Sequence, residues 1–353
     1  MDRIIYFKIN GFNLWNGGLN YIKQLKKNLL TKSIELVILV NDFDKIGISK
    51  LNSYLIEYSL IYSNKYLRVL NYFFLRIGLS FTILKKHKHC NNKANIIYHG
   101  LIPVRYFTHK HQTTYWLPDI LHKIYPQNFS TLHYYKRLIF TNINLKLTDR
   151  ILLSSHSIKK QLKSIYNIDK NIIVYQFSSK IDIPKDFDRT FTKPVVLFPH
   201  EFWSHKRQEK IVDLANNNKD FIFLLTGNNR INQKNSSYEK FNCALKYLKH
   251  NNLINFGEID WNLLTQLYSQ STYIGNLSDY EGWNTSVEIA KYLGKNLILS
   301  KIDVHIEQTL NYKNIIWHKN NVKLPQNLNQ KVKYSYNKEL SNRLEKFCAD
   351  FFQ

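Results

Sequence analysis

The sequence predicts an α/β fold made of two Rossmann-like domains. An apolar run at 272–275, a polar loop, a helix from Thr285 and a second apolar run at 296–300 form one strand–loop–helix–strand unit. Such units wind right-handed into parallel sheets. The chain also begins with a strand over 4–9, a glycine-containing loop and a helix over 20–30, which is how a Rossmann-like domain starts. The 353 residues exceed the usual size of one domain, so we expect two.

Charge divides the chain into unequal halves. The net charge is +24, of which residues 1–170 carry +18 and the remaining residues carry +6. This asymmetry supports a domain boundary near the middle of the chain. A positive field favours anionic partners such as a membrane surface, a phosphorylated lipid or glycan, or nucleic acid. A nucleic-acid-binding protein is therefore one alternative, although the sequence has neither zinc-ligand spacing nor an aromatic RNA-binding motif.

The sequence predicts a cytoplasmic protein. The cysteines Cys90, Cys243 and Cys348 lie far apart, which indicates no disulfide framework and fits a reducing compartment. We expect no secretory signal, because the first residues lead directly into a strand. We also expect no membrane-spanning helix, because no uncharged apolar run reaches the required length of roughly 18 residues.

A helix start beside a carboxylate indicates the chemistry of the strand–loop–helix–strand unit. Thr285 is a good helix N-cap, and Glu288 stands three residues later, which is the spacing of a capping box. The first backbone N–H groups of a helix attract anions, because they lack partners and the helix dipole adds positive charge. Glu281, just before this helix, would repel a phosphate, so we expect it to accept hydrogen bonds from sugar hydroxyls. A phosphate next to a polyol indicates a sugar nucleotide.

The stretch 281–295, with 304–308 downstream, resembles the donor-binding signature of the large retaining family 4 of glycosyltransferases. Members of that family have two Rossmann-like domains facing a cleft, an arrangement called GT-B. The resemblance implies metal-independent transfer of a sugar from a UDP-, GDP- or dTDP-sugar, with no cofactor and with Glu281 at the transferred sugar. The donor-binding residues that it implies on the loop and helix start are Gly282, Trp283, Asn284, Thr285 and Ser286.

The family pattern has a second glutamate eight positions after the first, where it holds the nucleotide ribose. Here that position is Ile289, and the glutamate stands one place earlier, at Glu288. Either Glu288 contacts the ribose after a small rotation of the helix, or the ribose is held otherwise, in which case Glu288 completes the capping box. The same departure leaves a catalytically weakened, transferase-like partner subunit as an alternative function.

Two further segments match the family pattern nearer the start of the chain. Gly17 and Gly18 resemble a glycine-rich loop that approaches the donor phosphates, and an ordinary tight turn is the alternative. Residues 116–130 are similar to a segment at the C-terminal end of a sheet strand. This implies that His122 hydrogen-bonds the donor sugar and that Asp119 orients the sugar or the acceptor hydroxyl. A purely structural histidine is the alternative for His122.

The loop after the apolar run 194–199 is expected to bind phosphate. In the family this loop supplies a cation to the donor diphosphate, and Lys206 matches that position with Arg207 beside it. Charge-assisted hydrogen bonds are worth about 1.5–3 kcal/mol each, so both cations would stabilise the departing nucleotide. The turn at Asn228, after the next strand, is expected to touch the nucleotide.

The expected domain limits follow from composition and from the resemblance. An acceptor-binding domain spans residues 1–178, and a linker over 179–193 contains charges and a proline but no apolar periodicity. A nucleotide-sugar-binding domain spans 194–337. The family resemblance implies that a final helix over 338–353 packs back on the first domain.

Together these features predict a retaining glycosyltransferase with a glycan or lipid-linked acceptor, in bacterial surface polysaccharide or lipopolysaccharide synthesis. Residues 65–89 are basic and aromatic and contain no acid, so we expect contact with an anionic membrane at the inner face of the cell membrane. A buried helix with a solvated basic edge is the alternative for this segment. His87, His89 and Cys90 have no second ligand cluster, so no metal site is predicted. A sugar-nucleotide epimerase on the same architecture is a further alternative.

Overall fold

The computed structural model of the chain describes residues 3–9, 16–41, 44–53, 56–61, 95–99, 112–183, 191–228, 236–326 and 334–353. The chain forms two compact units. Unit 1 comprises Met1–Ile124, Phe129–Phe177 and Leu340–Gln353, and unit 2 comprises Tyr125–Asn128 and Ser178–Glu339. The short segment Tyr125–Asn128 therefore belongs with unit 2, which nothing in the sequence indicates.

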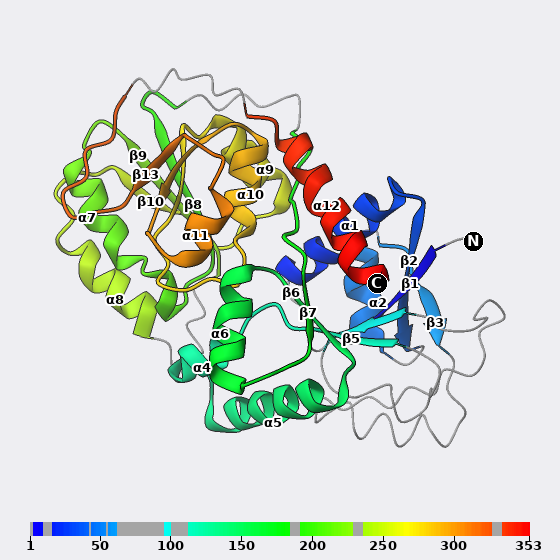
Figure 1. Ribbon diagram of the computed structural model, residues 1–353. Coiled ribbons are helices and arrows are strands. Elements are labelled where there is room, and N and C mark those ends of the chain that lie inside the picture. Colours follow the sequence, from blue (N-terminus) through cyan, green and yellow to red (C-terminus); the bar gives the residue numbers. More distant parts are fainter. Residues whose placement is uncertain are drawn as a thin grey trace. The chain divides into compact units, whose positions relative to one another are not determined.

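Unit 1 contains a seven-stranded sheet with the strand order β3-β2-β1-β4-β5-β6-β7 (Figure 1). All pairings between its described strands are parallel, and the order reverses between β1 and β4, as in a doubly wound Rossmann-like sheet. Its strands are β1 (Arg3–Lys8), β2 (Ile34–Asn41), β3 (Ser59–Ile61), β4 (Asn95–Tyr98), β5 (Gln112–Trp116), β6 (Arg150–Leu153) and β7 (Asn171–Val174). Its helices are α1 (Asn16–Leu30), α2 (Lys45–Ser53), α4 (Leu121–Ile124), α5 (Thr131–Leu147), α6 (His156–Tyr166) and most of α12 (Tyr336–Phe352).

The last helix completes the core of unit 1. Phe347 on α12 is fully buried, and its ring centroid lies 4.7 Å from that of Tyr175. Arg150 in β6 is also buried, and its Nη1 donates to the carbonyl oxygen of Phe351 at 2.5 Å. A buried guanidinium needs hydrogen-bond acceptors. The end of α12 provides one of them for the Arg150 side chain of β6.

Unit 2 contains a six-stranded parallel sheet with the order β10-β9-β8-β11-β12-β13, which is again the Rossmann-like order. Its strands are β8 (Val195–Pro199), β9 (Ile222–Thr226), β10 (Leu253–Asn255), β11 (Tyr273–Asn276), β12 (Asn296–Leu299) and β13 (Ile315–Trp317). Its helical segments are η3 (Pro126–Asn128), η4 (Ser204–Lys206), α7 (Glu209–Asn217), α8 (Ser236–Leu245), α9 (Trp261–Gln270), α10 (Thr285–Tyr292) and α11 (Asp303–Gln308).

Strand periodicity explains why the central strand β8 of unit 2 is apolar on both faces. Successive side chains of a strand point to opposite faces, so a sheet that is covered on both sides needs apolar residues at every position. Val196 and Phe198 in β8 pack in one core with residues of α7 and α8, whereas Val195 and Leu197 pack in a second core with residues of α9 and α10. Figure 1 shows these two helix pairs on the two sides of the sheet.

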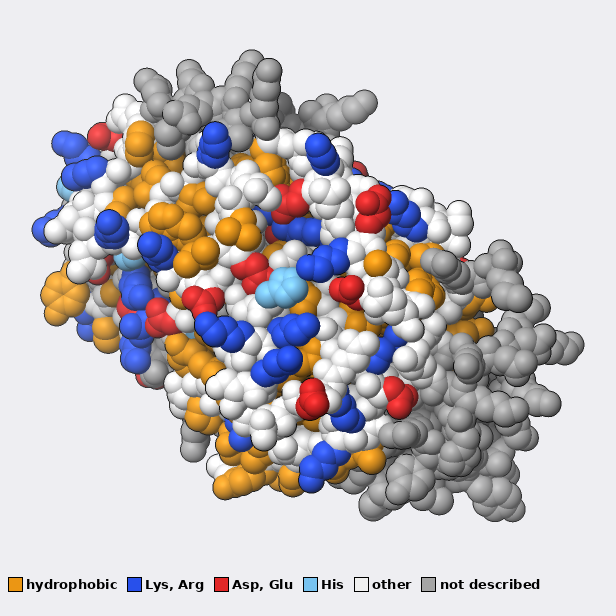
Figure 2. All heavy atoms as spheres, in the orientation of Figure 1, with side chains coloured by type: hydrophobic (Ala, Val, Ile, Leu, Met, Phe, Trp, Pro, Cys, Tyr) orange, Lys and Arg blue, Asp and Glu red, His pale blue; other side chains and the backbone are white. Residues whose placement is uncertain are grey.

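Two helices of unit 1 differ from the sequence-based expectation. Helix α1 begins at Asn16 rather than at residue 20, so Gly17 and Gly18 lie in its first turn and not in a loop. Helix α5 follows the predicted segment 116–130 and was not predicted, because apolar residues lie on its buried face, such as Leu145, and on its exposed face, such as Ile139, so its sequence shows no single apolar face. Figure 2 shows hydrophobic side chains gathered over α5, along the lower edge of the visible face.

The segment with the predicted membrane contact, 65–89, lies outside the described residues, and so do His87, His89 and Cys90. Within the described ranges, none of the helices combines the length and the apolar character that crossing a bilayer requires.

Candidate functional site

The topology of unit 2 brings two loops together at the carboxyl edge of its sheet. The strand order reverses between β8 and β11, and ligands of doubly wound folds bind at such a switch point. The loop after β8 carries Lys206, and the loop after β11 carries Glu281. Lys206 Nζ donates to Glu281 Oε1 at 2.6 Å. The backbone N–H of Asp279 donates to the carbonyl oxygen of His205 at 2.8 Å, so the main chains of the two loops are joined as well.

Glu281 is a buried carboxylate surrounded by hydrogen-bond donors. Only 8% of its surface is exposed. Its Oε1 also accepts hydrogen bonds from Asn276 Nδ2 at 3.1 Å and from Asn284 Nδ2 at 3.2 Å. Burial alone would raise the pKa of Glu281, but the charge of Lys206, two nearby histidines and the hydrogen bond from Lys206 together lower it to about 2. The carboxylate is therefore ionised at neutral pH.

His305 in α11 provides a buried acceptor. Its Nδ1 lies 2.8 Å from the carbonyl oxygen of Ser300. A carbonyl can only accept, so Nδ1 carries the proton and Nε2 is left as an acceptor. This Nε2 has no partner among the described residues. Burial lowers the pKa of His305, although the charge of Glu281 opposes the shift, so the ring is neutral at neutral pH.

His200, directly after β8, provides a complementary donor. Gln208 Nε2 lies 3.3 Å from His200 Nδ1 and donates to it, so the proton of the ring is on Nε2. Burial, and then the charge of Lys206, lowers the pKa of His200 to about 3. Within the described ranges, His200 Nε2 and the Ser278 hydroxyl are both buried without a partner. The surroundings of the Lys206–Glu281 pair thus offer one donor, one acceptor and one hydroxyl that can act as either.

Asn284, and not Thr285, is the N-cap of α10. The side-chain oxygen of Asn284 accepts from the backbone N–H groups of Ser286 at 2.9 Å and Val287 at 3.2 Å. The capping box expected from Thr285 is therefore wrong. Asparagine and threonine are both good N-caps. The position of Glu288 three residues after Thr285 pointed to Thr285, although its neighbour Asn284 is the cap. A phosphate that used these two N–H groups would have to displace the Asn284 side chain.

Glu288 is fully buried and is bonded within unit 2. Its Oε1 accepts from Gln308 Nε2 and its Oε2 accepts from the Tyr336 hydroxyl, both at 3.1 Å. A ribose could reach this carboxylate only if these bonds opened. Ile289 packs in the apolar core beside the sheet. The second glutamate of the family pattern thus has no surface-accessible counterpart in this helix.

Gln308 holds the start of α10 in place. Its Oε1 accepts from the backbone N–H of Asn284 at 3.2 Å, and its Nε2 donates to the carbonyl oxygen of Asn284 at 3.0 Å. Lys291, which is only 1% exposed, donates to the carbonyl oxygen of Gln308 at 2.5 Å and to Glu339 Oε1 at 3.0 Å. The end of α10 and the end of α11 are thereby locked together.

The loop after β8 also packs tightly on its neighbours in unit 2. Gly227, at the end of β9, has a φ of +120°, and a Cβ there would lie 2.6 Å from the carbonyl oxygen of His200. Only glycine fits that conformation and that contact. Asn128 accepts a hydrogen bond from the hydroxyl of Ser204, and its Nδ2 lies 3.1 Å from His205 Nδ1. These contacts set the position of the loop.

Two further predicted residues of unit 2, Arg207 and Asn228, have partners within the unit. Arg207 forms ion pairs with Asp279 at 2.9 Å and with Glu209 at 3.3 Å. The pair with Asp279 keeps Arg207 beside the loop that carries the site carboxylate. Asn228 is exposed and donates to Glu258 at 2.9 Å, at the end of β9.

The predicted site residues of unit 1 have structural partners. Asp119 Oδ1 accepts from the backbone N–H of Leu121 at 2.9 Å and so caps α4. His122 is 2% exposed, and its Nε2 lies 3.2 Å from the hydroxyl of Tyr166. Burial, and then the charge of Arg137, lowers the pKa of His122 to about 4. Contacts of Asp119 and His122 with a sugar or an acceptor stay predictions.

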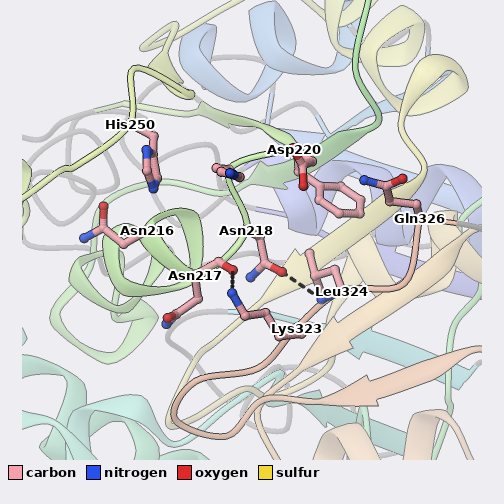
Figure 3. Close-up of a pocket in the computed structure, with 10 residues that line it drawn as sticks. Asn216, Asn217, Asn218, Asp220, His250, Lys323, Leu324 and Gln326 are labelled. Carbon is pink, nitrogen blue, oxygen red and sulfur yellow. Dashed lines mark hydrogen bonds between the residues drawn. The ribbon is translucent and has the colours of Figure 1, made fainter.

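A cavity of about 210 Å³ lies at the opposite, amino-terminal edge of the unit 2 sheet (Figure 3). Its polar groups join the segment after β13 to the end of α7. Lys323 Nζ donates to the carbonyl oxygen of Asn217 at 2.6 Å, and the backbone N–H of Leu324 donates to Asn218 Oδ1 at 2.7 Å. Because doubly wound sheets bind ligands at their carboxyl edge, we assign no ligand to this cavity.

Asn284→Ala is expected to destabilise the protein more than a matched cap deletion. Loss of an N-cap costs about 1 kcal/mol, and Asn284 caps two N–H groups and also donates to Glu281. Ser155, the N-cap of α6, accepts from one N–H group only. Urea denaturation should therefore show a larger loss for Asn284→Ala than for Ser155→Ala. Equal losses would show that neither the second capped N–H group nor the bond to Glu281 adds to stability.

Comparison by sequence gives no assignment. No protein-family model matches this chain, and no curated protein matches it significantly.

Comparison by structure gives clear similarities. HepE from Anabaena in complex with UDP-glucose has a TM-score of 0.59 at 13% identity, covering 99% of this chain and 93% of that chain. The lipopolysaccharide outer core galactosyltransferase WaaB has a TM-score of 0.57 at 16% identity, covering 99% of both chains. Sucrose-phosphate synthase from Thermosynechococcus elongatus has a TM-score of 0.60 at 14% identity, covering 99% and 95%. The predicted fold class is confirmed: this chain has the two Rossmann-like domains of the GT-B fold.

Proposed function

We propose that the protein is a glycosyltransferase that uses a nucleotide-diphosphate sugar. The observation that carries this proposal is the contact between Lys206 and Glu281 at the switch point of the unit 2 sheet. One side chain binds an anion and the other accepts hydrogen bonds from hydroxyls, and a nucleotide sugar presents a diphosphate beside a polyol. The structural neighbours include HepE in complex with UDP-glucose and a galactosyltransferase, which supports the same choice.

A bound donor would replace the contact between Lys206 and Glu281 with contacts to the ligand. The diphosphate would take Lys206 as its counter-ion, with Arg207 beside it, and Glu281 would accept from hydroxyls of the sugar. The buried Nε2 atoms of His200 and His305 are a donor and an acceptor, which suits a ligand that carries both phosphate oxygens and hydroxyls. A bound donor could therefore give partners to polar atoms of the site that are already buried without one.

The reaction that we propose retains the anomeric configuration. The bond from the anomeric carbon to the phosphate oxygen breaks and the nucleotide diphosphate leaves, while the oxygen of the acceptor hydroxyl attacks that carbon from the same face, so the configuration is kept. The departing phosphate accepts the proton of the acceptor hydroxyl. Lys206 and Arg207 stabilise the developing negative charge, without a metal ion, by charge-assisted hydrogen bonds in a partly buried site. We assign no protein nucleophile.

The acceptor belongs to the proposal as well. We propose a glycan or a lipid-linked glycan as the acceptor, and the charge favours one that carries phosphate, because residues 1–170 carry +18 of the net +24. We therefore propose that the protein acts in surface polysaccharide or lipopolysaccharide synthesis, in the cytoplasm and at an anionic membrane. Asp119 and His122 are the proposed contacts for the acceptor hydroxyl and the donor sugar.

Thermal shifts with UDP, GDP and dTDP, with the matching monophosphates as controls, test donor recognition. A ligand at about a hundred times its Kd stabilises the folded state by roughly 2.7 kcal/mol. One diphosphate should raise the Tm, and its monophosphate should raise it less. No shift with any of the three would contradict the proposal.

One observation favours a weakened partner subunit as the second candidate. The carboxylate nearest to the family's ribose-binding position, Glu288, is buried and bonded to Gln308 and Tyr336. Substituting glutamate for Ile289 is a poor test, because it would place a charge in an apolar core. Release of nucleotide diphosphate from a nucleotide sugar separates the two functions, since a partner subunit would bind the nucleotide and show no turnover.

A further inference from the structure

Helix α5 presents a continuous apolar stripe on its outer face. The stripe consists of Leu132, Tyr135, Ile139 and Ile143, which are 81%, 54%, 52% and 37% exposed. These residues recur every three or four positions. On a helix with 3.6 residues per turn they fall within an arc of roughly 80°. We call this set the α5 stripe.

The face of α5 that points inward is partly polar. Asn144 is 0% exposed and Thr141 is 4% exposed, and Asn144 Oδ1 accepts from the hydroxyl of Tyr98 at 3.4 Å. A surface helix of a globular protein normally turns its apolar residues inward and its polar residues outward. Rotating α5 to bury the stripe would break these polar contacts, so the stripe stays outside.

Such a stripe marks a contact surface rather than ordinary exposure. Single exposed apolar residues are common, but contiguous apolar patches on a monomer mark interaction sites for proteins or membranes. Figure 2 shows hydrophobic side chains over α5 with Lys and Arg side chains among and beside them.

The charge around the stripe identifies its partner. Between Asp119 and Asp149 the sequence contains four basic residues and no acidic one. Helical spacing places Lys136 and Lys146 on the same side of α5 as the stripe. A second copy of this surface would bring like charges together, whereas an acidic phospholipid surface attracts the cations and receives the apolar side chains.

We propose that α5 binds the surface of an anionic phospholipid bilayer. The α5 stripe inserts between the headgroups, and Lys136 and Lys146 lie against the lipid phosphates. This inference rests on the membrane contact in the proposed function and assigns it to a described surface outside 65–89. It does not depend on sugar transfer, so a vesicle assay and a turnover assay can fail separately.

Flotation with phosphatidylcholine vesicles, with and without phosphatidylglycerol, tests the apolar part of the proposal. The full chain should float with the anionic vesicles only. Ile139→Gln with Ile143→Gln should weaken this binding by about tenfold, because two inserting side chains become polar. The matched control is Ile165→Gln with Ile183→Gln, since these isoleucines are 41% and 43% exposed but lie outside the stripe. The control should bind as the unmodified chain does.

A second pair of variants tests the charged part. Lys136→Gln with Lys146→Gln should reduce binding and its salt dependence. Lys160→Gln with Lys163→Gln, on α6, removes the same charge elsewhere and should have a smaller effect.

Three outcomes would overturn the assignment. The chain does not float with anionic vesicles, or the isoleucine pair on α5 behaves like its control, or the chain is a dimer that the α5 variants dissociate. The last result would make the stripe a face for a second copy. Circular dichroism of each variant establishes that it is folded.

Discussion

Lys206→Ala is expected to lower kcat/KM for the nucleotide-sugar donor by at least about tenfold, or about 1.4 kcal/mol of transition-state stabilisation. The ammonium group is the cation closest to the buried site carboxylate, at 2.6 Å, and the departing diphosphate would lose its main counter-ion. Steady-state kinetics with the nucleotide that shifts the Tm provides the measurement. Lys210→Ala is the matched control, because Lys210 pairs with Asp279 at 3.1 Å and is 32% exposed. Equal kinetics for the two variants would remove Lys206 from the site.

The same substitution should also destabilise the fold, and this effect must be separated from catalysis. Removing one partner of a buried ion pair leaves the other charge unpaired and costs about 3–5 kcal/mol, somewhat less here because Lys206 is 15% exposed. Glu281→Gln combined with Lys206→Ala removes that unpaired charge and should recover much of the lost stability. Activity should stay low in the double variant. Recovery of both stability and activity would make the pair purely structural.

Stability is expected to fall as the pH is lowered from about 4.5 towards 2, with Glu281 as a main contributor. The pKa of Glu281 is about 2 in the folded chain, and it is about 4.3 in an unfolded chain. In this window the unfolded state binds more protons, so protonation favours unfolding as the pH falls. The contribution at neutral pH is about 3 kcal/mol and is lost once the folded-state pKa is passed.

Urea denaturation across this pH range, for the unmodified chain and for Glu281→Gln, isolates the effect. The variant should be less stable at neutral pH and should depend less on pH. Glu345→Gln is a suitable control, because Glu345 also pairs with a lysine, Lys32 at 2.9 Å, but on the surface, where an ion pair contributes little. Parallel pH profiles for the unmodified chain and Glu281→Gln would contradict the low pKa of Glu281.

The fold was predictable because it rests on periodicity and strand order. Fully apolar runs such as 195–198 indicate strands buried on both faces, and alternation of strands with helices indicates a parallel sheet. The proximity of Lys206 and Glu281 was predictable too, because each follows a strand and the carboxyl ends of these two parallel strands lie at the same edge of the sheet. Helix α5 was missed for a physical reason: apolar residues lie on its exposed face as well as on its buried face, and Asn144 and Thr141 face the interior, so its sequence shows no single apolar face.

The finer parts of the site could not be predicted from patterns. Nothing in the spacing of the chain says that Gln308 would bond both backbone groups of Asn284. The hydrogen bond from Tyr336 to Glu288 joins residues 48 positions apart and needs the three-dimensional path of the chain. Asn284 and Thr285 are adjacent and both side chains are suitable N-caps, so the sequence does not show at which of the two the helix begins.

The absence of a Cβ at Gly227 restricts which substitutions the candidate site can tolerate. At position 227 any side chain would meet the main chain of His200 and Glu201, at 2.6–2.8 Å from the new Cβ. A larger residue at position 227 would push the segment after β8 outward. Lys206, on the same loop, would then move away from Glu281. Homologues that replace this glycine should therefore show compensating insertions or deletions between 200 and 206, and directed-evolution libraries should leave position 227 unchanged.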